Sequence, residues 1–132
     1  MALGLHAVNL ANKWLDMLAG TAFTAPPASA LRLHTGDPGA AGTSALSAEA
    51  TRKAMTWSVA AGGVKAVVAT FPSWPAWSAG SETLSHGAAW DSVTTGAGNF
   101  LYSFAFTVAK PVTNGDTVNL TAHSFTLTPL AA

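Results

Sequence analysis

The spacing of hydrophobic residues changes near residue 20. Before it, apolar side chains recur every three or four residues, the pattern of one face of a helix. The members of this face are Ala7, Leu10, Ala11, Trp14, Leu15 and Leu18. A helix is therefore predicted over residues 5–18, ended by Gly20, which readily adopts the left-handed conformation common at helix ends. Val8 and Met17 widen the apolar arc, so we expect the helix to contact more than one surface.

Beyond residue 29, apolar and polar residues alternate in short runs separated by Gly, Pro and Asn, which is typical of strands joined by turns. Ala30–His34 predicts a half-buried strand, and Phe100–Val108 predicts the clearest one, with four aromatic rings on one face. Gly62-Gly63 predicts a hairpin turn. The other predicted strands are Lys53–Ala60, Val64–Phe71, Glu82–Trp90, Thr117–Leu120 and His123–Thr128. The segment Pro72–Gly80 is expected to be a proline-interrupted loop.

These elements predict a mainly β fold, an antiparallel β-sandwich of about seven short strands with one N-terminal α-helix. We expect a single domain over residues 1–132. Within it, residues 1–20 form the helix, residues 21–29 an extended linker containing Pro26-Pro27, and residues 30–132 the sandwich. The helix either covers the sheet or docks on a neighbouring subunit. No internal repeat of the kind that a long fibre shaft needs is present.

Composition narrows the functional classes. Only 9% of the 132 residues are charged and the formal net charge is zero, whereas about 25% charged residues are usual. A surface so poor in charge suits a protein packed in an assembly. The lack of a Lys/Arg cluster argues against nucleic-acid binding. No apolar run has the length of a membrane span, the N-terminus lacks the basic region of a signal peptide, and no cysteine is present.

No group of residues has a catalytic or metal-binding spacing. The four histidines do not pair at ligand spacing. His34, Asp37 and Ser44 have the residue types of a hydrolytic triad, but no Gly-x-Ser-x-Gly elbow is present. The glycine-rich stretch Gly36–Gly42 lacks the Gly-Lys-Ser/Thr of a phosphate-binding loop. We therefore expect a protein that is not an enzyme and that has no catalytic residue, cofactor or metal.

The tryptophans are the strongest candidates for binding. Trp74, Trp77 and Trp90 can plug the end of the sandwich, anchor a protein interface or stack on sugar rings. The predicted protein interface combines two of them with the helix. Its residues are Leu10, Trp14, Leu18, Trp74 and Trp77.

Several short motifs follow one another over nearly the whole chain. They are Leu10–Asp16, Gly20–Pro26, Leu33–Gly39, Arg52–Ala54, Gly62-Gly63, Trp90-Asp91, Lys110–Val112 and Asn114–Thr117. This ordered set resembles a family of small accessory virion proteins of tailed phages, frequent in phages of actinobacteria and labelled tail fibre, minor tail or capsid accessory proteins. The segment Pro72–Gly80, with its tryptophans and prolines, departs from the family pattern.

The resemblance implies a non-enzymatic structural protein of a tailed phage virion. Combined with the low charge, it favours an accessory surface subunit that decorates and stabilises the capsid. The alternatives are a minor tail or tail-fibre-associated protein and a carbohydrate-binding module that reads host cell-wall sugars through its tryptophans. The expected partners are the phage major capsid protein or tail proteins and further copies of the chain, with no nucleic acid and no membrane. The expected location is the virion, on the capsid surface or the tail.

Overall fold

The computed structural model describes residues 3–69 and 71–127. Its N-terminal helical segment consists of a π-helical turn (Ala7–Ala11), the helix α1 (Asn12–Asp16) and a 3-10 turn (Met17–Ala19). Gly20 ends the segment as predicted, because its φ of 80° is left-handed and its N–H donates to the Met17 carbonyl at 3.0 Å. No helix in residues 3–69 and 71–127 is long and apolar enough to cross a membrane.

One layer of the β-structure is an antiparallel sheet with the strand order β2-β1-β5-β6. Its strands are β1 (Ala30–His34), β2 (Lys53–Ala54), β5 (Glu82–Trp90) and β6 (Phe100–Val112). β1 lies opposite β5 with Leu31 beside Ala89. The long strand β6 lies at the edge of this sheet.

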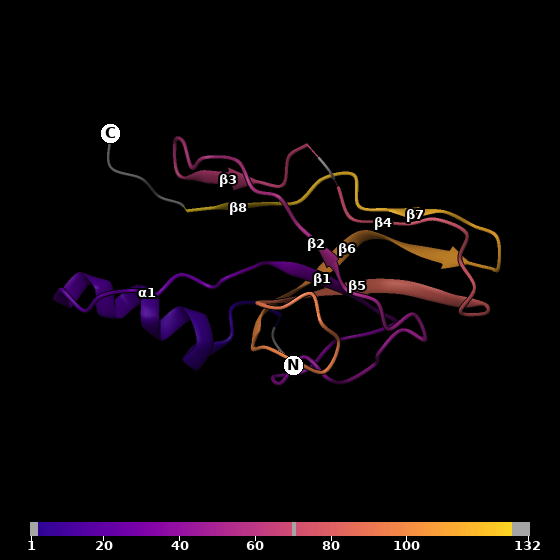
Figure 1. The fold of residues 1–132 in the computed structure, drawn as a ribbon, viewed down its shortest axis with the longest axis horizontal. Helices are drawn as coiled ribbons and strands as arrows, with labels where there is room; N and C mark the ends of the chain where they lie inside the picture. Colours follow the sequence, from indigo (N-terminus) through magenta and orange to yellow (C-terminus); the bar gives the residue numbers. More distant parts are fainter. Residues whose placement is uncertain (1–2, 70, 128–132) are drawn as a thin grey trace.

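The second layer is a two-stranded ribbon that lies above the sheet in Figure 1. It contains the pairs β3 (Val64–Ala66) with β8 (Ser124–Thr126) and β4 (Ser73–Trp74) with β7 (Val118–Asn119). The two pairs continue each other through single hydrogen bonds, from Val67 N–H to the His123 carbonyl at 2.8 Å and from Leu120 N–H to the Pro72 carbonyl at 2.9 Å.

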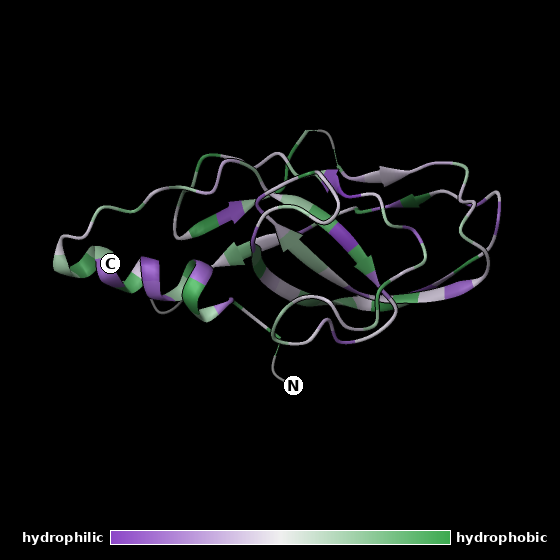
Figure 2. Ribbon diagram, turned by 60° about the horizontal axis from the view of Figure 1, so that its bottom comes forward, coloured by the Kyte–Doolittle hydropathy of each residue, from purple (hydrophilic) through white to green (hydrophobic). Residues whose placement is uncertain are grey.

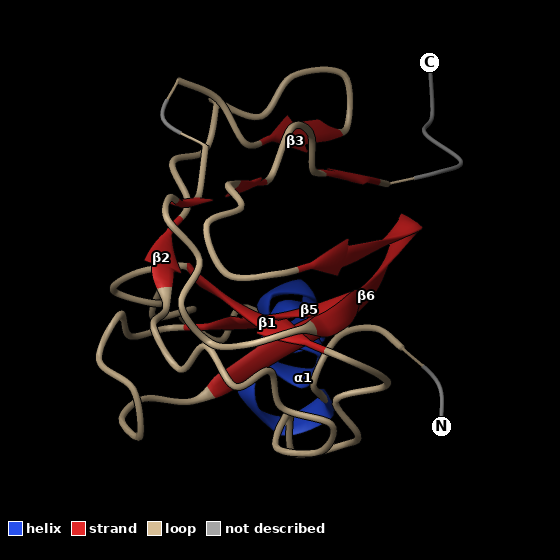
Figure 3. Cartoon of the chain, turned by 90° about the vertical axis from the view of Figure 1, so that its right-hand side faces the viewer, coloured by secondary structure: helices blue, strands red, loops and turns tan. Residues whose placement is uncertain are grey.

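The chain that follows β2 joins the two layers. Ala54 still pairs with β1, whereas Trp57 forms a bridge with Val67 and the Thr56 carbonyl accepts the Val68 N–H at 2.8 Å. Figure 3 shows β2 on the side where the layers meet. Through these contacts the strands follow one another in a curved, open arrangement. Its order is β7–β8, then β3–β4, β2, β1, β5 and β6. Its two outer strands are β6 and β7–β8.

The core lies between the layers. Leu31, Leu33 and Leu84 from the sheet pack with Trp74 and Val118 from the ribbon. The absence of a side chain at Gly87 has a structural reason, because a Cβ there would lie 2.8 Å from both the Leu31 Cδ1 and the Phe104 Cζ. Such contacts are far inside van der Waals distance, so glycine at this position of β5 lets the neighbouring side chains meet over the sheet.

The predicted fold class, a mainly antiparallel β fold with an N-terminal helix, is confirmed, with eight strands in the described ranges. β1 and β5 have the predicted bounds. The strand predicted over Lys53–Ala60 is limited to its first two residues, because the chain there leaves the sheet for the ribbon. The prediction of a loop over Pro72–Gly80 was wrong at β4, which lies between the two prolines at positions 72 and 75. Thr128 lies outside the described residues.

Candidate functional site

The helical segment is attached to the β-structure through its first turn. The Asn9 Nδ2 donates to the Phe100 carbonyl at 2.8 Å. Just before the segment, the His6 N–H donates to the Leu101 carbonyl at 2.7 Å. On the same side Leu10 is buried and Trp14 is half-buried, and both pack against the core cluster. One face of the predicted apolar arc is thus used for packing within the chain.

Four apolar side chains of the same helical segment are exposed. Val8 is 66% exposed, Leu15 63% and Leu18 87%, and Met17 is exposed beside them. We call these four residues the exposed helix face. Figure 2 shows the helical segment at one end of the molecule, beside the strands rather than between them. Clustered exposed apolar side chains of this kind mark interaction sites.

An apolar groove lies between the helical segment, the linker that follows it and the end of the ribbon. Its volume is about 740 Å³. Its large side chains include Leu10, Trp14, Phe23, Met55, Trp57 and Phe125. Among the described residues, Lys65 is the only charged one in its lining, and its Nζ already donates to the Ser58 carbonyl at 2.8 Å. The groove is therefore suited to bind apolar side chains, because its lysine already has a hydrogen-bond partner.

Two of the candidate tryptophans are part of the core. Trp74 is 3% exposed and Trp77 2%. Their indole N–H groups are also satisfied within the chain, because Trp74 donates to the Thr51 carbonyl at 3.1 Å and Trp77 to the Gly80 carbonyl at 2.8 Å. The interface role of these two rings is corrected accordingly: they plug the fold, which was one of the three interpretations that the sequence left open. Neither offers a face to a sugar.

Of the five predicted interface residues, only Leu18 and Trp14 reach the surface. Leu18 is fully available, Trp14 is half-buried at the groove, and Leu10 is buried beneath it. Trp74 and Trp77 lie in a different part of the fold, in and after β4. The structure therefore brings the helix residues together and separates them from the two tryptophans.

The third candidate, Trp90, is half-buried and is covered by a cation. The Arg52 guanidinium carbon lies 4.0 Å from the centre of the Trp90 ring. Arg52 is itself buried, and its Nη1 donates to the carbonyls of Ser92, Thr94 and Ala97 at 3.1, 3.0 and 2.6 Å. Arg52 therefore organises the loop 91–99. Sequence reasoning missed this role, because the carbonyls that the side chain binds belong to a loop about 40 residues away along the chain.

The three residue types of a hydrolytic triad do not form one. The His34 Nδ1 lies 2.9 Å from the Ser44 carbonyl rather than from its hydroxyl. The Asp37 Oδ1 accepts the Gly39 N–H at 2.8 Å, a turn contact. Burial lowers the pKa of His34. In residues 3–69 and 71–127, no group of three or more His, Asp and Glu side chains is placed to hold a metal ion.

A comparison with family models finds one described as Podophage GP4 fiber I protein gp80, which matches residues 7–128. The match begins at the first residue of the helical segment and includes every strand. No curated protein matches the chain.

Proposed function

The chain belongs to the family of podophage GP4 fiber I protein gp80, and on this premise we propose that it is a non-enzymatic subunit of the phage tail, attached to a neighbouring tail protein through its N-terminal helix. The expected relationship to phage fibre-type proteins is confirmed. The accessory role, the actinobacterial origin and the capsid location stay predictions.

The exposed helix face is the observation that carries the proposal. Its four large apolar residues belong to a helical segment whose other side already packs on the β-structure. Burial of one such side chain in an interface contributes about 1.5–3 kcal/mol. The rest of the chain has a mixed, weakly charged surface, with 9% charged residues. A neighbouring protein that covers the helix would therefore gain more binding free energy from this face than from an equal area of the mixed surface.

The fold supports a compact attached unit rather than a shaft. The described strands form a four-stranded sheet and two strand pairs stacked in two layers, with a helix at one end, and the sequence has no repeat that would extend them. The apolar groove lies beside the same helical segment and is lined by its packed residues Leu10 and Trp14.

The test is incorporation of a Leu18→Ser variant into particles of the phage that encodes the protein. We expect loss of most of the protein from purified virions, because Leu18 is the most exposed member of the helix face. Val93→Ser is the matched control, since Val93 is 51% exposed in the loop 91–99 and does not line the groove beside the helix. Wild-type loading of the Leu18→Ser protein would contradict the attachment. Immunogold labelling of wild-type virions decides the location: label on the tail supports the proposal, and label over the shell supports capsid decoration instead.

A further inference from the structure

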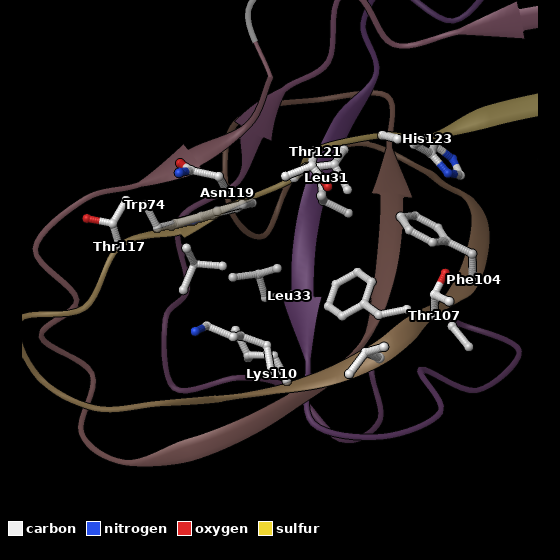
Figure 4. A pocket seen from close by; sticks show the side chains of 17 residues that line it. Leu31, Leu33, Trp74, Phe104, Thr107, Lys110, Thr117, Asn119, Thr121 and His123 are labelled. Carbon is white, nitrogen blue, oxygen red and sulfur yellow. The ribbon is translucent and has the colours of Figure 1, made fainter.

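The two outer strands of the curved arrangement face each other across a slit. Figure 4 looks into it. One wall is Phe104–Val108 with Lys110 from β6, and the other is the segment Thr117–His123 that contains β7. Leu31, Leu33 and Leu84 form the floor, and the volume is about 610 Å³. We call this feature the edge slit.

The walls of the edge slit are consecutive in the chain but unpaired. β6 continues into β7 through a turn in which the Asp116 N–H donates to the Thr113 carbonyl at 3.1 Å. Strands joined by so short a turn normally form a hairpin ladder. Here, among the strands that the structure describes, β6 is paired with β5 and β7 with β4, and β6 and β7 are not paired with each other. No backbone hydrogen bond crosses from 104–110 to 117–123, all of which are described residues.

Side chains hold the walls together at the end opposite the turn. The Phe104 and His123 rings are stacked with their centres 4.0 Å apart. The Tyr102 hydroxyl lies 3.1 Å from the His123 Nε2. Between these contacts and the turn, the residues that line both walls are largely exposed. Those exposed residues are Ala105, Thr107, Val108, Lys110, Thr117, Asn119, Thr121 and Ala122.

Nearer its start, the same edge of β6 already pairs with the residues that precede the helical segment. Leu5 forms an antiparallel bridge with Tyr102, and the Ser103 N–H donates to the Gly4 carbonyl at 3.0 Å. Backbone direction alternates along a strand, so the Ala105 N–H points the same way as that of Ser103. The ladder is not continued at Ala105 by any backbone hydrogen bond among the described residues.

The charge of the edge slit indicates what its occupant carries. Lys110 is the only charged residue in the lining. Its ammonium group has no hydrogen bond or ion pair with any residue in 3–69 and 71–127, and in Figure 4 the side chain is seen beside Leu33. An occupant with a carboxylate at this position would complement it. The leucine floor suits apolar side chains on the alternate positions.

We propose that the edge slit binds an extended segment of a partner polypeptide as an additional β-strand. The segment hydrogen-bonds to the free edges of β6 and β7, points apolar side chains at the leucine floor and places an acidic side chain beside Lys110. Strand addition to an exposed sheet edge is a common mode of peptide recognition, in which backbone bonds supply affinity and side-chain pockets supply specificity. The surface is separate from the exposed helix face, so the inference does not depend on attachment through the helix.

The probe is a capped peptide of seven residues that alternates threonine and valine, with its central threonine replaced by glutamate. Hydrogen exchange on the full chain reads the amides of Ala105 and Asn119. We expect these amides to become protected at saturating peptide. A Lys110→Gln variant should bind the peptide about threefold more weakly, as for a partly exposed ion pair, and Lys13→Gln is the matched control on the helix. Ala105→Pro removes one edge donor and should weaken binding further.

Four outcomes decide the proposal. Protection confined to the slit edges with a Lys110-dependent affinity supports it. No protection at millimolar peptide overturns it, as does equal binding of the glutamate peptide and its threonine parent. Protection of the same amides that grows with protein concentration, without peptide, assigns the slit to a second copy of the chain and overturns the partner proposed here. If Ala105→Pro fails to fold, the Lys110→Gln comparison remains the test.

Discussion

At the scale of single residues, Arg52 has the most demanding environment. A buried cation without a carboxylate partner is costly unless its donors are satisfied. Arg52 meets this condition in part: its Nη1 contacts three carbonyls of one loop and its guanidinium lies over Trp90, whereas its buried Nε has no hydrogen-bond partner among the described residues. The loop contains two glycines, Gly96 and Gly98, yet keeps a defined shape because the loop backbone turns around the Arg52 guanidinium.

Replacement of Arg52 by methionine should therefore lower the free energy of unfolding by about 2–3 kcal/mol, because three carbonyls lose a charged donor. Lys53→Met is the control, since Lys53 is the adjacent residue and makes no such contacts in the described residues. Chemical denaturation measures the change, and hydrogen exchange should show faster exchange of the Asp91 and Ala97 amides. An equal effect of the two substitutions would contradict the role of Arg52.

His123 gives the fold a dependence on pH. The ring is stacked on Phe104 and shielded from water, which lowers its pKa from 6.5 to about 4. The unfolded chain therefore binds a proton that the folded chain excludes in this range, so stability falls as the pH drops from about 6.5 towards 4. Because the ring is partly solvated, we expect the loss to be on the order of 1–2 kcal/mol rather than the full linkage value.

A His123→Phe variant should retain the stacking and lose that part of the pH dependence. Thermal melting between pH 7 and pH 4 measures it. His34 is also buried with a lowered pKa, so some dependence should remain in the variant, and His34→Phe combined with it should flatten the curve further. An unchanged pH profile in His123→Phe would show that folding does not lower the pKa of His123.

At the scale of elements, the pattern of apolar residues predicted where helix and strands lie but not which face is buried. The wide apolar arc of the helix allowed packing on the sheet and contact with a neighbour, and the structure assigns Leu10 to packing and Leu18 to the exposed side. The reason is local: the hydrogen bonds of His6 and Asn9 to β6 fix the rotation of the helix. The spacing of apolar residues along a helix cannot predict contacts between residues more than 90 positions apart.

This division predicts opposite effects for two leucines in the same helical segment. Leu10→Ala should lower the free energy of unfolding by about 2–4 kcal/mol, as for buried leucines elsewhere. Leu18→Ala should change it by less than about 0.5 kcal/mol, because the side chain is already in water. Urea denaturation of the isolated chain measures both. Equal destabilisation by the two variants would mean that Leu18 packs within the chain.

At the scale of the whole molecule, the alternation of strands predicted an antiparallel β fold but not its open edge. β1 and β5 were predictable because each has an apolar run bounded by turn residues. The lack of pairing between β6 and β7 was not, since strands joined by a short turn such as Asn114-Gly115-Asp116 commonly pair with each other. The candidate site was also predictable only in part. The spacing of apolar residues predicted the helix. Whether Trp74 and Trp77 lie in the core or at the surface depends on how the two layers pack, which the sequence does not show.

The low charge of the whole chain leads to a last prediction. With a formal net charge of zero and a pI near 6.9, electrostatic repulsion between copies is minimal at neutral pH. The exposed helix face then becomes the main determinant of self-association. Sedimentation velocity at pH 7 should show an oligomer that grows with concentration, and Leu18→Glu should shift the population to monomer, because a carboxylate in an apolar contact must be desolvated. Val93→Glu adds the same charge in the loop 91–99, at a residue that lines neither the groove nor the edge slit, and should leave the oligomer in place. If Val93→Glu dissociates the oligomer equally, net charge rather than the helix face controls association.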